Sequence, residues 1–101
     1  MKSKTVSLTI IEKLDYLMWD YNISAQDSYE VLIGSKPMAG HYDQFSLFRK
    51  MLETFPWFTI MELLPLPRIK ELLTEQVTTK LRSKQLQTRY EYIRDRLSAT
   101  I

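Results

Sequence analysis

The stretch FSLFRKMLETFPWFTIMELL, Phe45–Leu64, decides the fold. At about 100° per residue, the apolar side chains of its first half fill one wide arc of a helix, and the charged side chains fill the rest. Pro56 disfavours helical geometry in the residue before it but is well accepted as the first residue of a new helix. The stretch therefore predicts two helices that meet at Pro56 and face a common core. Its first inward arc is expected to comprise Phe45, Leu47, Phe48, Met51, Leu52 and Phe55.

The second of these helices has a narrower apolar pattern. Thr59 and Glu62 are expected to point away from the core. Ahead of the first helix, Asp43 suits the positive end of a helix, where a negative charge is favoured. The inward face of the second helix is expected to comprise Trp57, Ile60, Met61 and Leu64.

Local signals divide the rest of the chain into further helices. Ser24 is a capping residue, and Gly34 is a common helix stop. Thr74 can cap a segment that begins with Glu75. The apolar spacing slips after Leu81, so that either a new helix starts there with Ser83 as its cap or the helix bends. The expected helices cover residues 9–20, 25–33 and 68–73, followed by one bent helix or two helices between residues 75 and 97.

Composition restricts the class of protein. The 101 residues are 45% apolar and 26% charged, with two glycines and no cysteine. We expect one domain over residues 1–101, all-α, a compact irregular bundle of five or six helices with frayed ends at 1–7 and 98–101. No apolar run reaches the length needed to cross a bilayer, and the first residues lack the pattern of a signal peptide. The absence of cysteine fits a reducing compartment, so the expected location is cytoplasmic.

The sequence offers no set of catalytic or metal-ligating residues. His41 is the one histidine, and Asp43 two positions later would not face it on a helix. A zinc site needs three or four clustered ligands, and a calcium loop needs closely spaced oxygens and a glycine. We therefore expect a protein that is not an enzyme and has no catalytic residue, metal or cofactor.

Four aromatic side chains form a candidate partner patch: Tyr16, Trp19, His41 and Tyr42. Tyr16 and Trp19 lie off the apolar stripe of the first helix. They either pack on a neighbouring element or anchor a partner, since Tyr and Trp are favoured interface residues. The segment SKPMAG, residues 35–40, is a plain connection, a hinge or a binding loop.

The C-terminal part of the chain is basic. Residues 68–101 carry eight basic and four acidic side chains, whereas residues 1–67 carry six basic and eight acidic ones. In the last helix a polar stripe flanks the apolar face by about a quarter turn. Its arginines can contact phosphates, or can cover apolar surface with their stems. The stripe comprises Arg82, Gln85, Arg89, Tyr92 and Arg96, and the helix–turn–helix spacing around Thr74 adds to the nucleic-acid hypothesis.

Short motifs along most of the chain resemble a group of small bacterial proteins. They are Trp19-Asp20, the LFRKMLE segment Leu47–Glu53, Pro56-Trp57, and the RIKELL segment Arg68–Leu73. The chain looks similar to short uncharacterised bacterial helical proteins with an N-terminal Trp-Asp, some encoded beside nucleotidyltransferase-type toxins. That resemblance implies an accessory or antitoxin-like role and implies no active-site residue.

Two functional hypotheses follow from the sequence. The first is a non-enzymatic module that binds another protein or a second copy of itself. The alternative is a nucleic-acid-binding regulator that uses Arg82, Arg89, Tyr92 and Arg96. Neither hypothesis involves a membrane.

Overall fold

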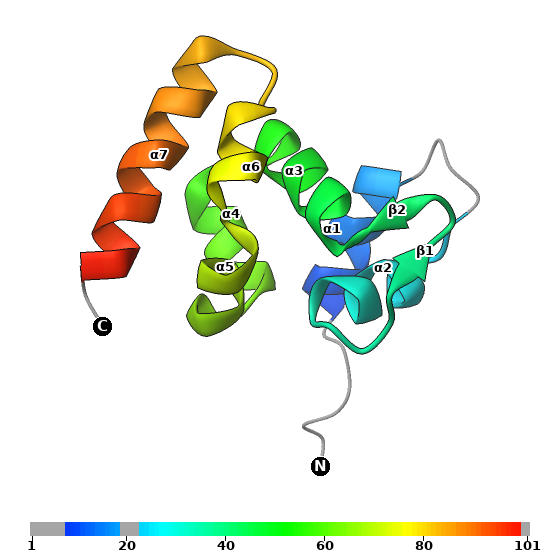
Figure 1. Ribbon diagram of the computed structural model, residues 1–101. Helices are drawn as coiled ribbons and strands as arrows, with labels where there is room; N and C mark the ends of the chain where they lie inside the picture. Colours follow the sequence, from blue (N-terminus) through cyan, green and yellow to red (C-terminus); the bar gives the residue numbers. More distant parts are fainter. Residues whose placement is uncertain (1–7, 19–22, 100–101) are drawn as a thin grey trace.

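The computed structural model describes residues 8–18 and 23–99, and these residues are almost entirely helical (Figure 1). The predicted all-α class is confirmed, with seven helices in the described residues rather than five or six. The helices before the central break are α1 Leu8–Met18, α2 Ala25–Leu32 and α3 Gln44–Thr54. Those after it are α4 Trp57–Leu63, α5 Leu66–Leu72, α6 Glu75–Thr79 and α7 Lys84–Ala99. Two short strands, β1 Met38–Ala39 and β2 Tyr42–Asp43, precede α3.

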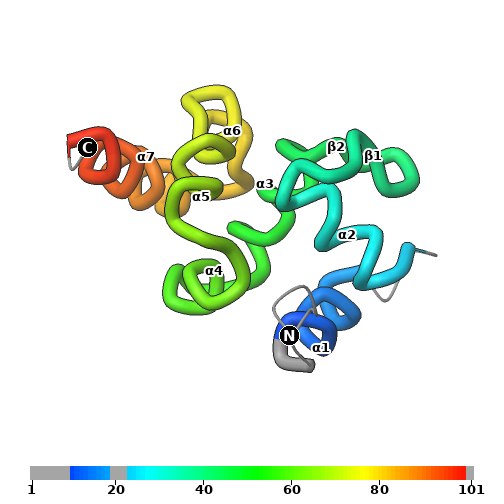
Figure 2. The backbone as a smooth tube through the Cα atoms, turned by 90° about the horizontal axis from the view of Figure 1, so that it is seen from below, coloured from blue at the N-terminus to red at the C-terminus, as the bar shows by residue number. Residues whose placement is uncertain are grey.

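Helix α3 lies between two groups of elements. Figures 1 and 2 show α1, α2 and the strands on one side of it and α4 to α7 on the other. Its side chains Leu47, Phe48, Met51 and Leu52 are fully buried, as the periodicity predicted. Phe45 is 38% exposed, which corrects the prediction that it faces the core. It belongs to the first turn of α3, at the rim of the core.

The buried face of α4 differs from the predicted one. Thr59 is 3% exposed and Leu63 is also buried, while Met61 is 46% exposed. The buried face is thus rotated by about a quarter turn from the expected face. Trp57 remains half-buried and packs edge-on against Tyr90 of α7, with ring centroids 6.2 Å apart. Contacts with other helices therefore fix the rotation of α4.

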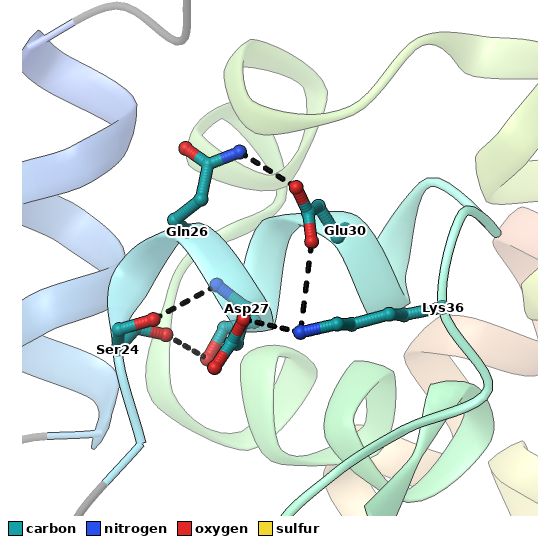
Figure 3. Close-up of polar contacts among 6 residues, drawn as sticks. Ser24, Gln26, Asp27, Glu30 and Lys36 are labelled. Atoms are coloured by element: carbon teal, nitrogen blue, oxygen red, sulfur yellow. Dashed lines mark hydrogen bonds and ion pairs between the residues drawn. The ribbon is translucent and has the colours of Figure 1, made fainter.

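The predicted N-cap of α2 forms in the structure. The Ser24 hydroxyl accepts a hydrogen bond from the Asp27 backbone N–H at 3.0 Å, and α2 ends before Gly34, which has φ +91°. Figure 3 shows how the following segment folds back on α2. Lys36 forms an ion pair with Asp27 and lies 3.7 Å from a carboxylate oxygen of Glu30. The chain after α2 is therefore held to that helix by side chains.

A two-stranded ribbon replaces the plain connection that the sequence suggested for residues 35–40. β1 and β2 pair antiparallel, with Ala39 opposite Tyr42, and Gly40 in the turn has φ +61°. Asp43 ends the ribbon and caps α3: its side chain accepts from the Ser46 N–H at 2.8 Å, and the Ser46 hydroxyl accepts from the Asp43 N–H. This reciprocal capping fixes where α3 begins.

The two helices in the C-terminal part of the chain are also capped at their N-terminal ends, as the sequence predicted. Thr74 accepts from the Val77 N–H, and Ser83 accepts from the Leu86 N–H. The slip after Leu81 therefore marks a new helix, α7. Tyr90 is the buried side chain of α7, and this helix continues to Ala99. The half-buried side chains that pack on the core from the same helix are Leu86, Ile93 and Leu97.

Arg68 joins segments that are distant in the sequence. From α5, its Nε donates to the Leu32 carbonyl at the end of α2 at 2.6 Å. One terminal nitrogen donates to the Gln44 side chain at the start of α3, and the other donates to Glu71 Oε1 at 2.9 Å. A single guanidinium therefore links α2, α3 and α5. This role of Arg68 was not predicted from the sequence.

Candidate interaction surfaces

The structure places Tyr16 on the surface near the end of α3. Its side chain is 66% exposed, and its ring centroid lies 6.2 Å from that of Phe55 at an interplanar angle of 41°. Glu12 and Lys13 line the same shallow hollow. The Tyr16 ring thus packs at a tilt against Phe55 and remains accessible. Trp19, the other aromatic residue predicted in this region, lies outside the described residues.

His41 and Tyr42 belong to a different place. Their rings stack with centroids 4.7 Å apart, in the turn and second strand that lead into α3. Phe55, beside Tyr16, is the C-cap of the same helix. Because α3 has 11 residues, its two ends are about 16 Å apart. The structure therefore does not join Tyr16 to His41 and Tyr42 in one compact patch.

The predicted basic stripe is partly assembled. Arg89, Tyr92 and Arg96 are exposed on α7, and the Arg96 guanidinium lies 5.9 Å from the centre of the Tyr92 ring. Arg82 precedes the helix, and its backbone N–H and guanidinium donate to the side chain and carbonyl of Glu53. Of the four predicted binding residues, Arg89, Tyr92 and Arg96 thus share one face of α7, and Arg82 does not.

The helix–turn–helix interpretation does not fit the lengths of the helices. The helix after Thr74 is α6, which has five residues and is about 8 Å long. A recognition helix has to enter the major groove and present several side chains. The exposed helix of the C-terminal part is instead α7, with 16 residues.

A separate apolar surface lies on α4 and the start of α5. Phe58 is 65% exposed, Met61 is 46% exposed and Leu66 is 44% exposed. Phe58 and Met61 are three positions apart, so they share the outer face of α4. Pro65 and Pro67 are also exposed beside Leu66. We call these five residues the α4–α5 surface.

The number of apolar residues in this part of the sequence already indicated an exposed apolar surface, although their helical spacing did not show which residues form it. The segment WFTIMELL, Trp57–Leu64, has six apolar residues in eight, more than one face of a short helix can bury. At least one large side chain had to remain outside. Which one depended on the rotation of α4, which is set by contacts with α3 and α7.

A hollow next to this surface is lined by two positively charged side chains. It has a volume of about 270 Å³, and we call it the α5–α7 hollow. Arg94 is one of its lining residues, and the Nε of this side chain is buried and has no hydrogen-bond acceptor among the described residues. Lys70 contributes the second positive charge. The lining residues are Lys70, Leu73, Thr74, Glu75, Arg94, Leu97 and Ser98.

The shifted pKa values have structural causes. The hydrogen bond from Lys36 lowers the pKa of Asp27, and the same contact raises the pKa of Lys36. The backbone hydrogen bond from Ser46 lowers the pKa of Asp43, which fits its capping role. Burial raises the pKa of the Tyr90 phenol. These groups serve ion pairing, capping and packing.

Two observations on the described residues concern metal ions and membranes. Residues 8–18 and 23–99 contain no cluster of three or more His, Cys, Asp or Glu side chains that could hold a metal ion. Within the same ranges, every helix is too short or too polar to cross a bilayer.

Comparison of the chain with protein-family models, with curated proteins and with solved structures returned no significant match. The case for a function therefore rests on the residues and their geometry.

Proposed function

We propose that this protein is a non-enzymatic interaction module that binds another protein through the α4–α5 surface. The observation that carries the proposal is the pair Phe58 and Met61, two large apolar side chains with 65% and 46% of their surface exposed on one face of α4. Contiguous exposed apolar side chains are typical of protein-binding surfaces, and aromatic anchors contribute strongly to binding. The resemblance to small bacterial helical proteins adds an accessory or antitoxin-like role to this proposal, and the absence of cysteine adds a cytoplasmic location.

The test compares partner recovery by matched variants. A tagged full-length chain is cross-linked in its native cells and purified, alongside the double variant Phe58→Ser/Met61→Ser and the control Tyr92→Ser. Because all three positions are exposed, each variant should keep the helical circular-dichroism spectrum of the parent. We expect a discrete cross-linked partner with the parent chain and the control, and its loss with the double variant. Equal recovery by all three chains would count against the α4–α5 surface.

Self-association is one form of this proposal. Size-exclusion chromatography with light scattering over a wide concentration range measures it directly. A mass that rises from one chain to two, and stays at one chain in the Phe58→Ser/Met61→Ser variant, would identify the partner as a second copy. A constant single-chain mass would exclude self-association and leave a different protein as the partner.

Nucleic-acid binding through α7 is the second candidate function. It is supported by Arg89, Tyr92 and Arg96, which are exposed on one helical face, and by the absence of an ion pair for either arginine among the described residues. Phosphate contacts are strongest at low salt. Fluorescence anisotropy with labelled DNA and RNA at low salt should therefore show binding that Arg89→Ala/Arg96→Ala weakens. No binding at low salt would remove this candidate.

A further inference from the structure

We propose that the α5–α7 hollow binds the carboxylate of an acidic residue on the protein partner whose apolar side chains contact the α4–α5 surface. This inference rests on the proposed function, because it takes the partner as given and assigns its chemistry. The occupant is the acidic side chain of a different protein.

The first argument is the charge of the hollow. Lys70 comes from α5 and Arg94 from α7, so two helices contribute a positively charged residue to the lining. Glu75 also lines it, but no ion pair joins Glu75 to either cation in the structure of residues 8–18 and 23–99. Glu75 lies in the first turn of α6, where the helix dipole favours a negative charge. The two cations are therefore available to an external anion.

The second argument is the unpaired donor of Arg94. A buried N–H without an acceptor is unfavourable, because the group has lost its hydrogen bonds to water. Arg94 Nε is such a donor. Nε is closed to solvent, so an external oxygen reaches it only after the Arg94 side chain moves; a carboxylate would then accept from Nε and from a terminal nitrogen of the same guanidinium, which is the strong two-bond geometry. A ligand carboxylate would thus supply the acceptor that the described part of the chain does not.

The third argument is size. The hollow has a volume of about 270 Å³. Pockets for drug-sized ligands begin at about 300 Å³. The hollow is therefore suited to one side chain of a larger partner. Leu73 and Leu97 in its lining can contact the methylene groups of that side chain.

The fourth argument is position. Lys70 also lines a neighbouring hollow with Leu66 and Pro67, two residues of the α4–α5 surface. Figure 2 shows α5 between α4 and α7. The cationic hollow and the apolar surface are therefore neighbours across one helix. A segment with apolar side chains and a nearby acidic residue would match both.

The experiment follows the Nε–H signal of Arg94 in ¹⁵N NMR spectra of the full chain. The Arg94→Lys variant assigns the signal by its loss. The probe is the capped dipeptide N-acetyl-leucyl-glutamate amide, and its uncharged counterpart carries glutamine. We expect the glutamate probe to shift the Arg94 signal saturably, while the glutamine probe leaves it unchanged.

Two charge variants of the protein show which residues matter. Lys70→Gln should weaken the probe's apparent affinity about two- to fivefold, the range of a solvent-accessible charge pair. Lys84→Gln removes the same charge from the exposed first turn of α7 and should leave the affinity unchanged. An equal loss in both variants would reveal long-range attraction without a local site and would overturn the proposal.

Other outcomes overturn it too. No shift of the Arg94 signal, or an equal shift with the glutamine probe, would exclude a carboxylate site. Inorganic phosphate that binds as tightly as the glutamate probe would indicate a small-anion site. A shift caused by protein concentration alone would assign the hollow to a second copy. Probe binding in a chain whose α4–α5 surface captures no partner would refute the proposed function and leave the carboxylate site standing.

Discussion

Replacement of Arg68 by alanine should strongly destabilise the fold. The side chain is largely buried and donates to the Leu32 carbonyl, the Gln44 side chain and the Glu71 carboxylate. Hydrogen bonds from a charged donor are each worth about 1.5–3 kcal/mol. The pair with exposed Glu71 is worth only about 0–1 kcal/mol. Since water can partly replace the lost donor, we expect the free energy of unfolding to fall by about 2–4 kcal/mol.

Urea unfolding followed by circular dichroism measures this loss, and two further variants test its cause. Arg68→Lys cannot reproduce the forked geometry, so it should recover only part of the stability. Glu71→Gln removes the exposed ion pair and should change stability by less than about 1 kcal/mol. If Arg68→Ala lost less than about 0.5 kcal/mol, the effect of an ordinary surface substitution, the link between α2, α3 and α5 would not be structural.

Three further changes test the packing and the caps. Tyr90→Ala should lower the free energy of unfolding by about 3–5 kcal/mol, because it empties the buried site beside Trp57; a smaller loss by urea unfolding would indicate that α7 packs loosely. Gly40→Ala should lower the thermal midpoint, since an added Cβ would lie 2.7 Å from the Ile23 side chain at a φ of +61°; an unchanged midpoint would contradict the turn geometry. Asp43→Ala should cost about 1 kcal/mol through loss of the cap of α3. Because the folded-state pKa of Asp43 is lowered, its contribution is complete above about pH 4 and is lost as pH falls through the folded-state value. Asp43→Asn should therefore flatten the acid limb of stability plotted against pH, and an unchanged limb would contradict this.

Features set by neighbouring residues could be predicted from the sequence. Ser24, Thr74 and Ser83 cap helices as their local patterns indicated, because a cap needs only residues two or three positions away. The core of α3 was also predictable, since Phe48 and its helical neighbours lie on a face that is apolar over three turns.

Features set by distant residues could not be predicted in this way. Arg68 bonds to residues 24 and 36 positions away, so no local pattern indicates its role. The rotation of α4 depends on Tyr90 and on α3, and an error of a quarter turn exchanged Thr59 with Met61. That same error concealed the α4–α5 surface, because its residues had been assigned to the core or left unassigned.

The candidate site was predicted only in part. The exposed side chains of Tyr16 and Tyr92 agree with the sequence. Tyr16 and His41 are separated because Tyr16 packs at the C-terminal end of α3 and His41 precedes its N-terminal end, which only the tertiary arrangement reveals. Arg82 does not belong to the basic stripe in the structure, because α7 begins two residues later, at Lys84. The backbone N–H of Arg82 instead donates to the Glu53 side chain.

The most direct test of the α4–α5 surface is site-specific photo-cross-linking in the native cells. A photoreactive phenylalanine replaces Phe58 in one chain and Tyr92, a comparably exposed aromatic residue on α7, in another. The account predicts a discrete protein adduct from position 58 and none from position 92. An adduct from position 92 with none from position 58 would contradict it.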